Sequence, residues 1–315
     1  MAVRTLDEPW LDIVSYGRGG PSHRSALTAA HIEYIRRTVG RSPEVMIKVL
    51  PNGAGTTRAV ASHIAYVGRE GELAIETDDG HSLQDEKAGA TLAADWSLDM
   101  EAEARSLEPR AQQRTARLVH KLVFSMPPGT APEKVLRATK SFCREEFALK
   151  HRYALALHTD EAHPHVHVIV KAMSESGQRM NIRKETLRAW RESFAQELRK
   201  QGVPAHASSR RVRGNAAPRM SDGRYRSVQR GASILGARSV ARTDRPETVH
   251  SLVSGWVAVG ELLQKQGLHG LSQEVFRFAR QLPELRERSG ASASLPIDSA
   301  RPAPVRRIDE LQHVR

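Results

Sequence analysis

The sequence predicts a mixed α/β fold, with a largely antiparallel central sheet, helices packed over one face and a helical C-terminal extension. Two short apolar runs, Val45–Leu50 and Leu118–Ser125, have the length and composition of buried strands. Two further runs, Tyr153–His158 and His165–Val170, are joined by six residues and predict an antiparallel hairpin. Segments with apolar residues at helical spacing lie between these strands and supply the layer that covers the sheet.

The first half of the chain alternates helix and strand signals. A lead-in helix is predicted after residue 26, where apolar side chains recur at helical spacing. After the first strand, Thr56 and Thr57 can cap a helix over Arg58–Val67, which the following glycines would end. The stretch Glu72–Ala111 is acidic and irregular, with some helical content in Gly89–Glu108, and we interpret it as an insertion or a peripheral cover.

The second half continues with helices. Pro132 opens a helix whose apolar side chains recur as far as Phe147, and a later helix through Trp190 stops at Gly202. Pro246–Arg288 is predicted to be helical again. The predicted parts of the chain are an N-terminal extension at 1–44, the α/β domain at 45–205, an Arg-rich flexible segment at 206–245, a helical region at 246–290 and a polar tail at 291–315.

The chain is strongly basic, with a formal net charge of +12 and a pI near 10.2. Such a field usually indicates nucleic acid or an anionic membrane surface as the partner, while charge alone fits a solubilising surface equally well. No run approaches eighteen apolar residues and the first residues lack the pattern of a secretion signal, so we expect a cytoplasmic protein without membrane attachment. Cys143, the single cysteine, excludes an internal disulfide and a Cys-rich zinc site.

Histidines cluster around the predicted hairpin, where five of the fourteen fall between His151 and His167. Alternate residues of a strand point to the same face, so His165 and His167 lie side by side and the hairpin brings His158 opposite them. Three converging imidazoles form a metal site with open positions for water and substrate. Asp160 is placed to accept a proton from the far ring nitrogen of a ligand. The weaker alternative is a set of ordinary polar residues at a sheet boundary.

The residue types leave the metal open. An all-imidazole site binds zinc, manganese or iron comfortably, whereas chemistry on phosphate often uses Mg²⁺ or Mn²⁺ as the electrophile. We therefore predict a divalent metal cofactor, Mg²⁺ or Mn²⁺, with Zn²⁺ as an alternative. His163 lies in the turn, where it could either support the metal ligands without binding the metal or contact a phosphate. His151 is interpreted as having no role in the site.

The segment H-T-D-E-A-H-P-H-V-H-V-I-V at 158–170 resembles the third motif of the relaxase/mobilisation nuclease family, a branch of the HUH endonucleases. The stretches M-I-K-V-L-P-N-G-A-G-T-T and H-I-A-Y-V-G-R-E-G-E-L resemble the same family, most closely its T-DNA border endonuclease-like subgroup. The similarity extends over about residues 45–210. Ala162 and Lys171 depart from it, because many members have an acidic residue and an asparagine at these places.

The resemblance implies an HUH relaxase-like fold that nicks one DNA strand, with Tyr66 as nucleophile and His158, His165 and His167 as metal ligands. Attack by the phenol would give a 5′-phosphotyrosyl link and a free 3′-hydroxyl, and the retained bond energy would allow rejoining. A phenol is mostly protonated at neutral pH, so it needs a base or a nearby cation, which a metal bound by neutral imidazoles provides. Among the five tyrosines, Tyr66 by itself would be interpreted as a helix aromatic in the core, and the flanking match reverses that preference.

The implied substrate is single-stranded DNA at a transfer origin, in plasmid mobilisation or conjugative transfer. Accessory relaxosome proteins and a transfer coupling protein are the implied protein partners. Basic residues after the histidine strand and in the Arg-rich segment are predicted to bind DNA, although a solvated loop or a protein-docking segment would look the same. These residues are Arg179, Arg183, Lys184, Arg210, Arg211 and Arg213.

Three other functions fit parts of the sequence. A rolling-circle replication initiator or transposase of the HUH type usually has its tyrosine after the histidine pair, whereas Tyr66 precedes it. A DNA-binding accessory protein could keep the fold without catalysis, and substitution of Tyr66 by Phe would then change nothing. A cupin-like metalloenzyme for small molecules would have no use for the Arg-rich segment.

Overall fold

A computed structural model of the chain describes most of its helices and strands. The residues fall into two compact units, one around the sheet and one containing the C-terminal helices. Among the described residues, no helix combines the length and apolar character needed to cross a membrane. Most of the predicted Arg-rich segment and almost all of the polar tail lie outside the described residues. The described residues are 13, 27–51, 55–96, 117–210, 212–214 and 246–291.

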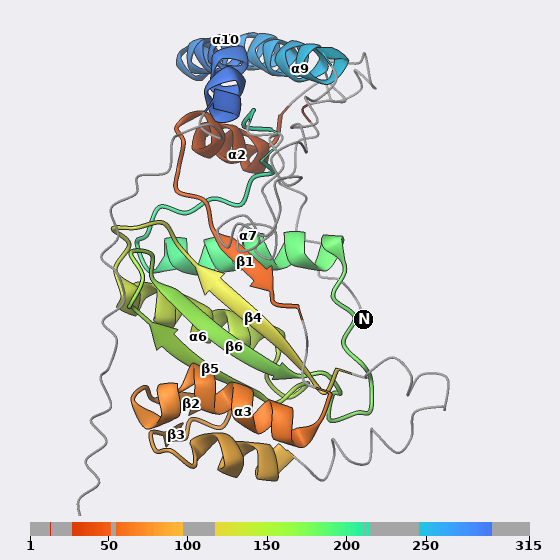
Figure 1. The fold of residues 1–315 in the computed structure, drawn as a ribbon. Coiled ribbons are helices and arrows are strands. Elements are labelled where there is room, and N and C mark those ends of the chain that lie inside the picture. The colour runs from red at the N-terminus through yellow and green to blue at the C-terminus, as the bar shows by residue number, and fades with distance from the viewer. Residues whose placement is uncertain are drawn as a thin grey trace, which may run out of the picture. The chain divides into compact units, whose positions relative to one another are not determined.

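The first unit is built on one sheet of six strands in the order β1-β4-β6-β5-β2-β3 (Figure 1). Every neighbouring pair is antiparallel, which confirms the predicted fold class. The predicted hairpin is β5–β6, in the register that pairs His158 with His165 and Ala156 with His167. The strands are β1 (Met46–Val49), β2 (Ile75–Thr77), β3 (Ser82–Leu83), β4 (Val119–Ser125), β5 (Tyr153–His158) and β6 (His165–Lys171).

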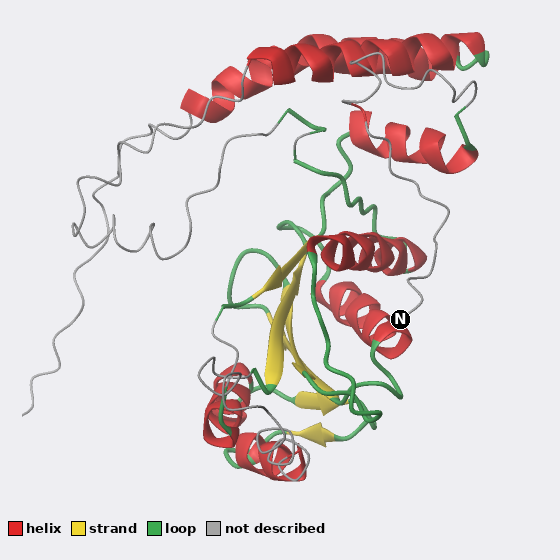
Figure 2. Ribbon diagram, turned by 90° about the vertical axis from the view of Figure 1, so that its right-hand side faces the viewer, coloured by secondary structure: helices red, strands yellow, loops and turns green. Residues whose placement is uncertain are grey.

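Helices lie on both faces of this sheet (Figure 2), whereas the sequence predicted them over one face. The difference arises because α3 packs its own apolar cluster against the second face. Helices α6 (Pro132–Glu146) and α7 (Lys184–Lys200) cover one face, and α3 (Thr57–Val67) lies on the other. The helix starts predicted at Thr56 and Pro132 are both observed. The Thr56 hydroxyl accepts a hydrogen bond from the Ala59 N–H, and Pro132 is the first residue of α6. The lead-in helix is α2 (Ala29–Val39), which also belongs to the first unit.

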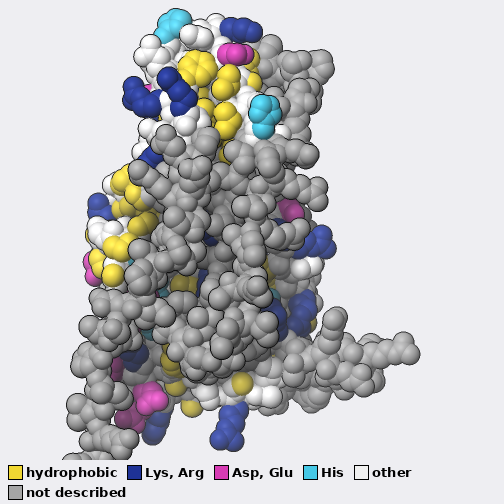
Figure 3. Space-filling view, turned by 45° about the horizontal axis from the view of Figure 1, so that its top comes forward, with side chains coloured by type: hydrophobic (Ala, Val, Ile, Leu, Met, Phe, Trp, Pro, Cys, Tyr) yellow, Lys and Arg dark blue, Asp and Glu magenta, His cyan; other side chains and the backbone are white. Residues whose placement is uncertain are grey.

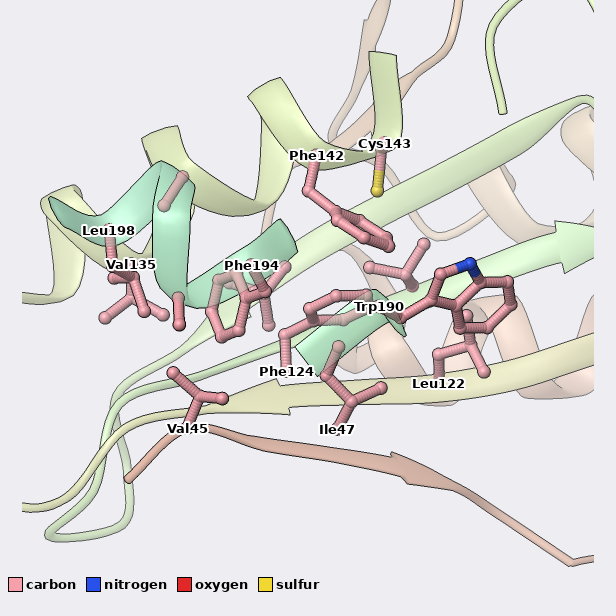
Figure 4. Close-up of a cluster of buried hydrophobic side chains, with 14 of the residues drawn as sticks. Val45, Ile47, Leu122, Phe124, Val135, Phe142, Cys143, Trp190, Phe194 and Leu198 are labelled. Carbon is pink, nitrogen blue, oxygen red and sulfur yellow. The ribbon is translucent and has the colours of Figure 1, made fainter. Parts of the chain in front are cut away.

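The main core lies between the sheet and α6 and α7 (Figure 4). The ring of Phe124 lies 5.0 Å from that of Phe142 and 5.1 Å from that of Phe194, measured between centroids. Val166 and Val168 of β6 are fully buried in the same cluster. Each such aromatic pair stabilises the fold by about 0.5–1.5 kcal/mol beyond the burial of its surface.

The stretch predicted as an insertion or a peripheral cover contributes two strands to the sheet as well as the helical content predicted within it. Strands β2 and β3 extend the sheet beyond β5, and residues 88–96 form a helix beside α3. Trp96 of this helix is buried with Val60 and Ile64 of α3. Gly89 allows the approach, because a Cβ there would lie 2.6 Å from the Ala61 carbonyl oxygen. Residues 97–116 lie outside the described residues.

In the second unit, the described residues 246–291 form two helices where one helical region was predicted. Helices α9 (Pro246–Lys265) and α10 (His269–Ala291) are separated at Gly267, whose φ of +78° favours glycine. The ring of Trp256 lies 5.1 Å from that of Phe278, so the two helices share an aromatic contact. The surface of the described part of this unit combines hydrophobic with basic side chains (Figure 3).

Candidate metal and tyrosine site

Three histidines converge at one end of the β5–β6 hairpin. His158 is the last residue of β5 and pairs with His165, while His167 follows on the same face of β6. The ring centroid of His158 lies 5.2 Å from that of His165 and 4.5 Å from that of His167, and the latter two are 5.3 Å apart. One nitrogen from each ring lies within 4.8 Å of the others, so the three could hold one metal ion.

Backbone carbonyls orient two of the three rings. Nε2–H of His158 donates to the Val67 carbonyl oxygen at 2.8 Å, and Nδ1–H of His165 donates to the His163 carbonyl oxygen at 3.2 Å. A carbonyl can only accept, so these two nitrogens carry the ring protons. The lone pairs therefore remain on Nδ1 of His158 and Nε2 of His165, as a metal ligand requires.

Burial favours the neutral form of two of the three imidazoles, those of His158 and His167. Burial, together with the neighbouring His158 and His165, lowers the pKa of His167 to about 3. Burial also lowers the pKa of His158. A cation binds the neutral imidazole, so these residues fit a divalent metal at neutral pH. An all-nitrogen donor set is softer than the oxygen ligands that Mg²⁺ prefers, which favours Mn²⁺ or Zn²⁺ on affinity alone.

A second possible metal group shares one of these ligands. It consists of Glu161, His163 and His165, and Nε2 of His163 lies 3.0 Å from the Glu161 carboxylate. Glu161 is exposed and His163 is partly exposed, because both lie in the turn between β5 and β6. The strand-borne group with His158 and His167 is more buried, so its ligands are already held in place before a metal binds.

Tyr66 lies at the end of α3 beside this histidine face. Its side chain is 67% exposed, which excludes the interpretation of a core aromatic. The Tyr66 ring stacks on that of His63, with centroids 6.1 Å apart and planes 19° apart. The next residue is Val67, whose carbonyl holds His158. The helix end that carries the phenol is therefore bonded directly to one proposed metal ligand.

His63 is a site residue that sequence reasoning missed. Burial, together with the positive charge of Lys121 on β4, lowers its pKa to about 4. His63 also contributes to the lowered pKa of His167, so the two imidazoles are electrostatic neighbours. The available signal was the H-I-A-Y spacing, because residues three apart share a side of a helix and His63 is three residues before Tyr66.

Asp160 lies beside the histidine site, but its partner differs from the predicted one. One of its oxygens lies 3.9 Å from Nδ1 of His158, and the other lies 2.5 Å from the Arg69 guanidinium. The far nitrogen of His158 is held by the Val67 carbonyl, so Asp160 is not its proton acceptor. Burial opposes ionisation of Asp160, but a backbone hydrogen bond and Arg69 outweigh it and lower the pKa of the carboxyl.

The basic residues proposed to bind DNA are spread over the molecule. Arg179 donates to the Arg117 carbonyl oxygen at 2.7 Å, near the end of β6 opposite the histidines. Arg183 caps the start of α7 and Lys184 is its first residue. Arg210 and Arg213 belong to the second unit, and Arg211 lies outside the described residues.

Two other residues also lie away from the histidine site. Lys171 is buried, with its ammonium 3.6 Å from the Glu175 carboxylate. It is six residues from His165 along β6, a separation of about 20 Å. His151 is buried and its Nδ1–H donates to the Lys171 carbonyl oxygen at 2.9 Å, consistent with an incidental, structural role.

Comparisons with known proteins agree with the motif at 158–170. A family model described as the relaxase nuclease domain, MobA/VirD2-like, matches residues 74–203, which include all three histidines and leave Tyr66 just outside.

The T-DNA border endonuclease VirD2 of Rhizobium rhizogenes is 25% identical over 226 residues, 65% of this chain and 51% of that protein. VirD2 of Agrobacterium fabrum is 25% identical over 203 residues, 59% of this chain and 44% of that protein. The chain thus spans about half the length of the curated relatives it matches. No solved structure matches it.

Proposed function

We propose that this protein nicks and rejoins one DNA strand at a transfer origin, because residues 74–203 match the model of the MobA/VirD2-like relaxase nuclease domain. The process served is plasmid mobilisation or conjugative transfer, with accessory relaxosome proteins and a coupling protein as partners. Tyr66 is the proposed nucleophile, and His158, His165 and His167 are the proposed metal ligands. One observation carries the proposal: the exposed Tyr66 directly precedes Val67, whose carbonyl accepts a hydrogen bond from His158.

The proposed reaction exchanges one phosphodiester for another. The phenol oxygen of Tyr66 forms a bond to phosphorus while the bond from phosphorus to the 3′-oxygen breaks. The phenol loses its proton to solvent and the departing 3′-oxygen gains one, so the reaction releases a free 3′-hydroxyl. The 5′ end stays attached to the protein, and attack by a 3′-hydroxyl reverses the exchange.

The chain's own residues supply orientation and charge. When bound, a divalent metal such as Mg²⁺ or Mn²⁺, with Zn²⁺ as an alternative, would polarise the scissile phosphate as an electrophile. Strand alternation points Lys48 of β1 and Lys121 of β4 to the same face as the histidines. Their positive charge favours a DNA phosphate on this face. The stacking of His63 against Tyr66 limits the positions of the phenol.

The proposal is tested by trapping the covalent product. Labelled single-stranded oligonucleotides that cover the origin are incubated with the protein and Mn²⁺ or Mg²⁺, then resolved on a denaturing gel. We expect a labelled protein band that requires the metal and is abolished by Tyr66→Phe, because phenylalanine lacks the attacking oxygen. Tyr225→Phe, in the Arg-rich segment, is the matched control and should leave the band unchanged.

The attachment site is then read by mass spectrometry. Trypsin cleaves after Arg58 and Arg69, so Tyr66 lies in the peptide A-V-A-S-H-I-A-Y-V-G-R. The nucleotide mass is expected on that peptide and on its tyrosine. A band that persists in Tyr66→Phe, or an adduct on a different peptide, would overturn the assignment of the nucleophile.

A further inference from the structure

A cavity of about 240 Å³, here termed the α7 cavity, lies between α7 and the segment that follows it. One wall carries Lys184, Arg188 and Arg191, which recur at spacings of four and three residues and so share one side of the helix. Residues 207–209 form the facing wall, and Leu187 contributes apolar surface. Three positive side chains therefore surround one small space.

The cavity holds positive charge without a carboxylate in its lining. Within the described part of the chain, neither Lys184 nor Arg191 forms an ion pair. Burial lowers the pKa of Arg191, and the neighbouring Arg188 lowers it further. Like charges in a partly buried space repel one another, and a bound anion would offset that repulsion.

The facing wall is fixed by its own hydrogen bonds. Both the N–H and the hydroxyl of Ser208 donate to the Glu44 carboxylate, at 2.9 Å and 2.5 Å. The same segment pairs with residues 43–45 through His206, whose Nε2 lies 2.8 Å from the Thr38 hydroxyl. Because Glu44 is bonded to Ser208, its charge holds the wall in place. The cavity is therefore preformed.

We propose that the α7 cavity binds a phosphodiester group of the DNA strand that extends from the histidine site, an inference that rests on the proposed function. Its volume is below the roughly 300 Å³ at which pockets for whole drug-sized ligands begin, so it suits one anionic group. Guanidinium groups bind phosphate oxygens in pairs and do so without regard to base sequence.

The β1 edge of the sheet connects the histidine face to the face that carries the α7 cavity. His165 pairs with Ser125, which pairs with Met46, so two strand spacings of about 5 Å each separate His165 from the β1 edge. Glu44, which holds the cavity wall, lies two residues before Met46. A single strand that leaves the histidine site and crosses this edge would pass from the face that α3 covers to the face that α7 covers.

The test pairs variants with oligonucleotides of two lengths. Arg188→Gln with Arg191→Gln removes two charges from the α7 cavity, and Arg137→Gln with Arg144→Gln removes two from exposed positions on α6. Affinity is measured by fluorescence anisotropy on full-length protein across a salt series. For a long oligonucleotide, we expect about tenfold weaker binding by the cavity variant and a salt slope reduced by about 0.7 for each phosphate that is no longer neutralised.

A neutral backbone identifies the ligand. The long oligonucleotide is remade with uncharged methylphosphonate linkages on the flank beyond the nick site. Wild type and cavity variant should then bind it equally, and both should bind a short oligonucleotide that covers only the nick site with unchanged affinity. Equal losses in the α6 control variant, or a cavity-variant defect that persists on the neutral flank, would overturn the proposal.

The experiments distinguish a failure of the proposed nicking reaction from a failure of the cavity proposal. If the wild type forms no Tyr66 adduct but the cavity variant still loses binding only on a charged flank, the α7 cavity stands as a DNA phosphate site and the nicking reaction is rejected. If the adduct forms and the cavity variant binds like the wild type, the nicking reaction stands and the cavity proposal is rejected.

Discussion

On the α6–α7 side of the sheet, β6 contributes Val166 and Val168 to a buried apolar core, whereas on the α3 side the same strand contributes His165 and His167. The apolar side is held by aromatic packing around Phe124. The α3 side combines a smaller apolar cluster with imidazoles and basic residues. Strand alternation therefore separates the strand residues that stabilise the fold from those proposed to nick DNA.

The separation explains why the α3 side can tolerate costly groups. Burying imidazoles lowers the pKa of His63 and His167 to about 4 and about 3, so their protonated forms are disfavoured in the folded protein. Such burial costs free energy unless a partner is present. The aromatic core on the other side of the same strands offsets that cost. Substitutions on the two sides should therefore have different consequences.

The largest effect on stability is expected on the α6–α7 side. Phe124→Ala removes a fully buried ring from between two others, so the free energy of unfolding should fall by about 3–5 kcal/mol. The adjacent Val123 points to the α3 side and is partly exposed, so Val123→Ala should cost about 1 kcal/mol. Urea unfolding followed by circular dichroism measures both. Equal losses would mean that the two sides share one core.

The largest effect on activity is expected on the α3 side. His167→Ala removes a proposed ligand and should reduce adduct formation by more than about 100-fold, beyond the loss typical of residues behind the ligands. Stability without metal should change little, because the aromatic cluster of the main core stays intact. His163→Ala is the matched control in the exposed turn. A loss as severe in His163→Ala would favour the group with Glu161 instead.

Acid should weaken the fold through buried histidines on both sides. Burial lowers the pKa of His120 to about 4, below the ordinary value of 6.5, so the folded protein binds fewer protons than the unfolded chain. Its contribution to stability is complete above pH 6.5 and is lost as the pH falls toward 4. His120→Gln should remove a loss on the order of 2 kcal/mol over this window. The measurement is urea unfolding from pH 7 to pH 4.

His81 supplies the control for that experiment. Its side chain is exposed, so His81→Gln should leave the acid dependence of unfolding as in the wild type. A His120→Gln variant with an unchanged acid dependence would show that other buried histidines, such as His63 and His167, account for the loss.

The smallest effect is expected at the ion pair beside the site. Asp160 and Arg69 are both more than a third exposed, so Asp160→Asn should change stability by less than about 1 kcal/mol. Adduct formation should fall only a few-fold, because His158 keeps its Val67 hydrogen bond. Arg69→Gln should have the same effect, and the double variant should be no worse than either single one. A loss as large as that of His167→Ala would indicate direct participation of Asp160.

The features that the sequence predicted well depend on short-range regularities. The two-residue period of strands placed His165 and His167 together, and the six-residue connection brought His158 to them. Helix starts at Thr56 and Pro132 followed from their capping chemistry. Such patterns need only the chain's own neighbours, so sequence reasoning reaches them.

The features that the sequence did not predict depend on segments that are distant along the chain and meet only in the fold. Strands β2 and β3 contain three and two residues, too few for a periodic signal, and are strands only because β5 offers a partner. His63 gains its significance from its electrostatic influence on His167, about a hundred residues away in sequence. The partner of His158 is a backbone carbonyl, which no residue type reveals. The wall of the α7 cavity likewise depends on Glu44 and Ser208 meeting across the fold.

The most direct test of the central claim is the anomalous scattering of Mn²⁺ in crystals of the protein. A single strong peak is predicted within bonding distance of Nδ1 of His158, Nε2 of His165 and one nitrogen of His167, with the Tyr66 hydroxyl on its open side. A peak held by Glu161 and His163 with His165, or the absence of any ordered peak among the three strand histidines, would contradict the account.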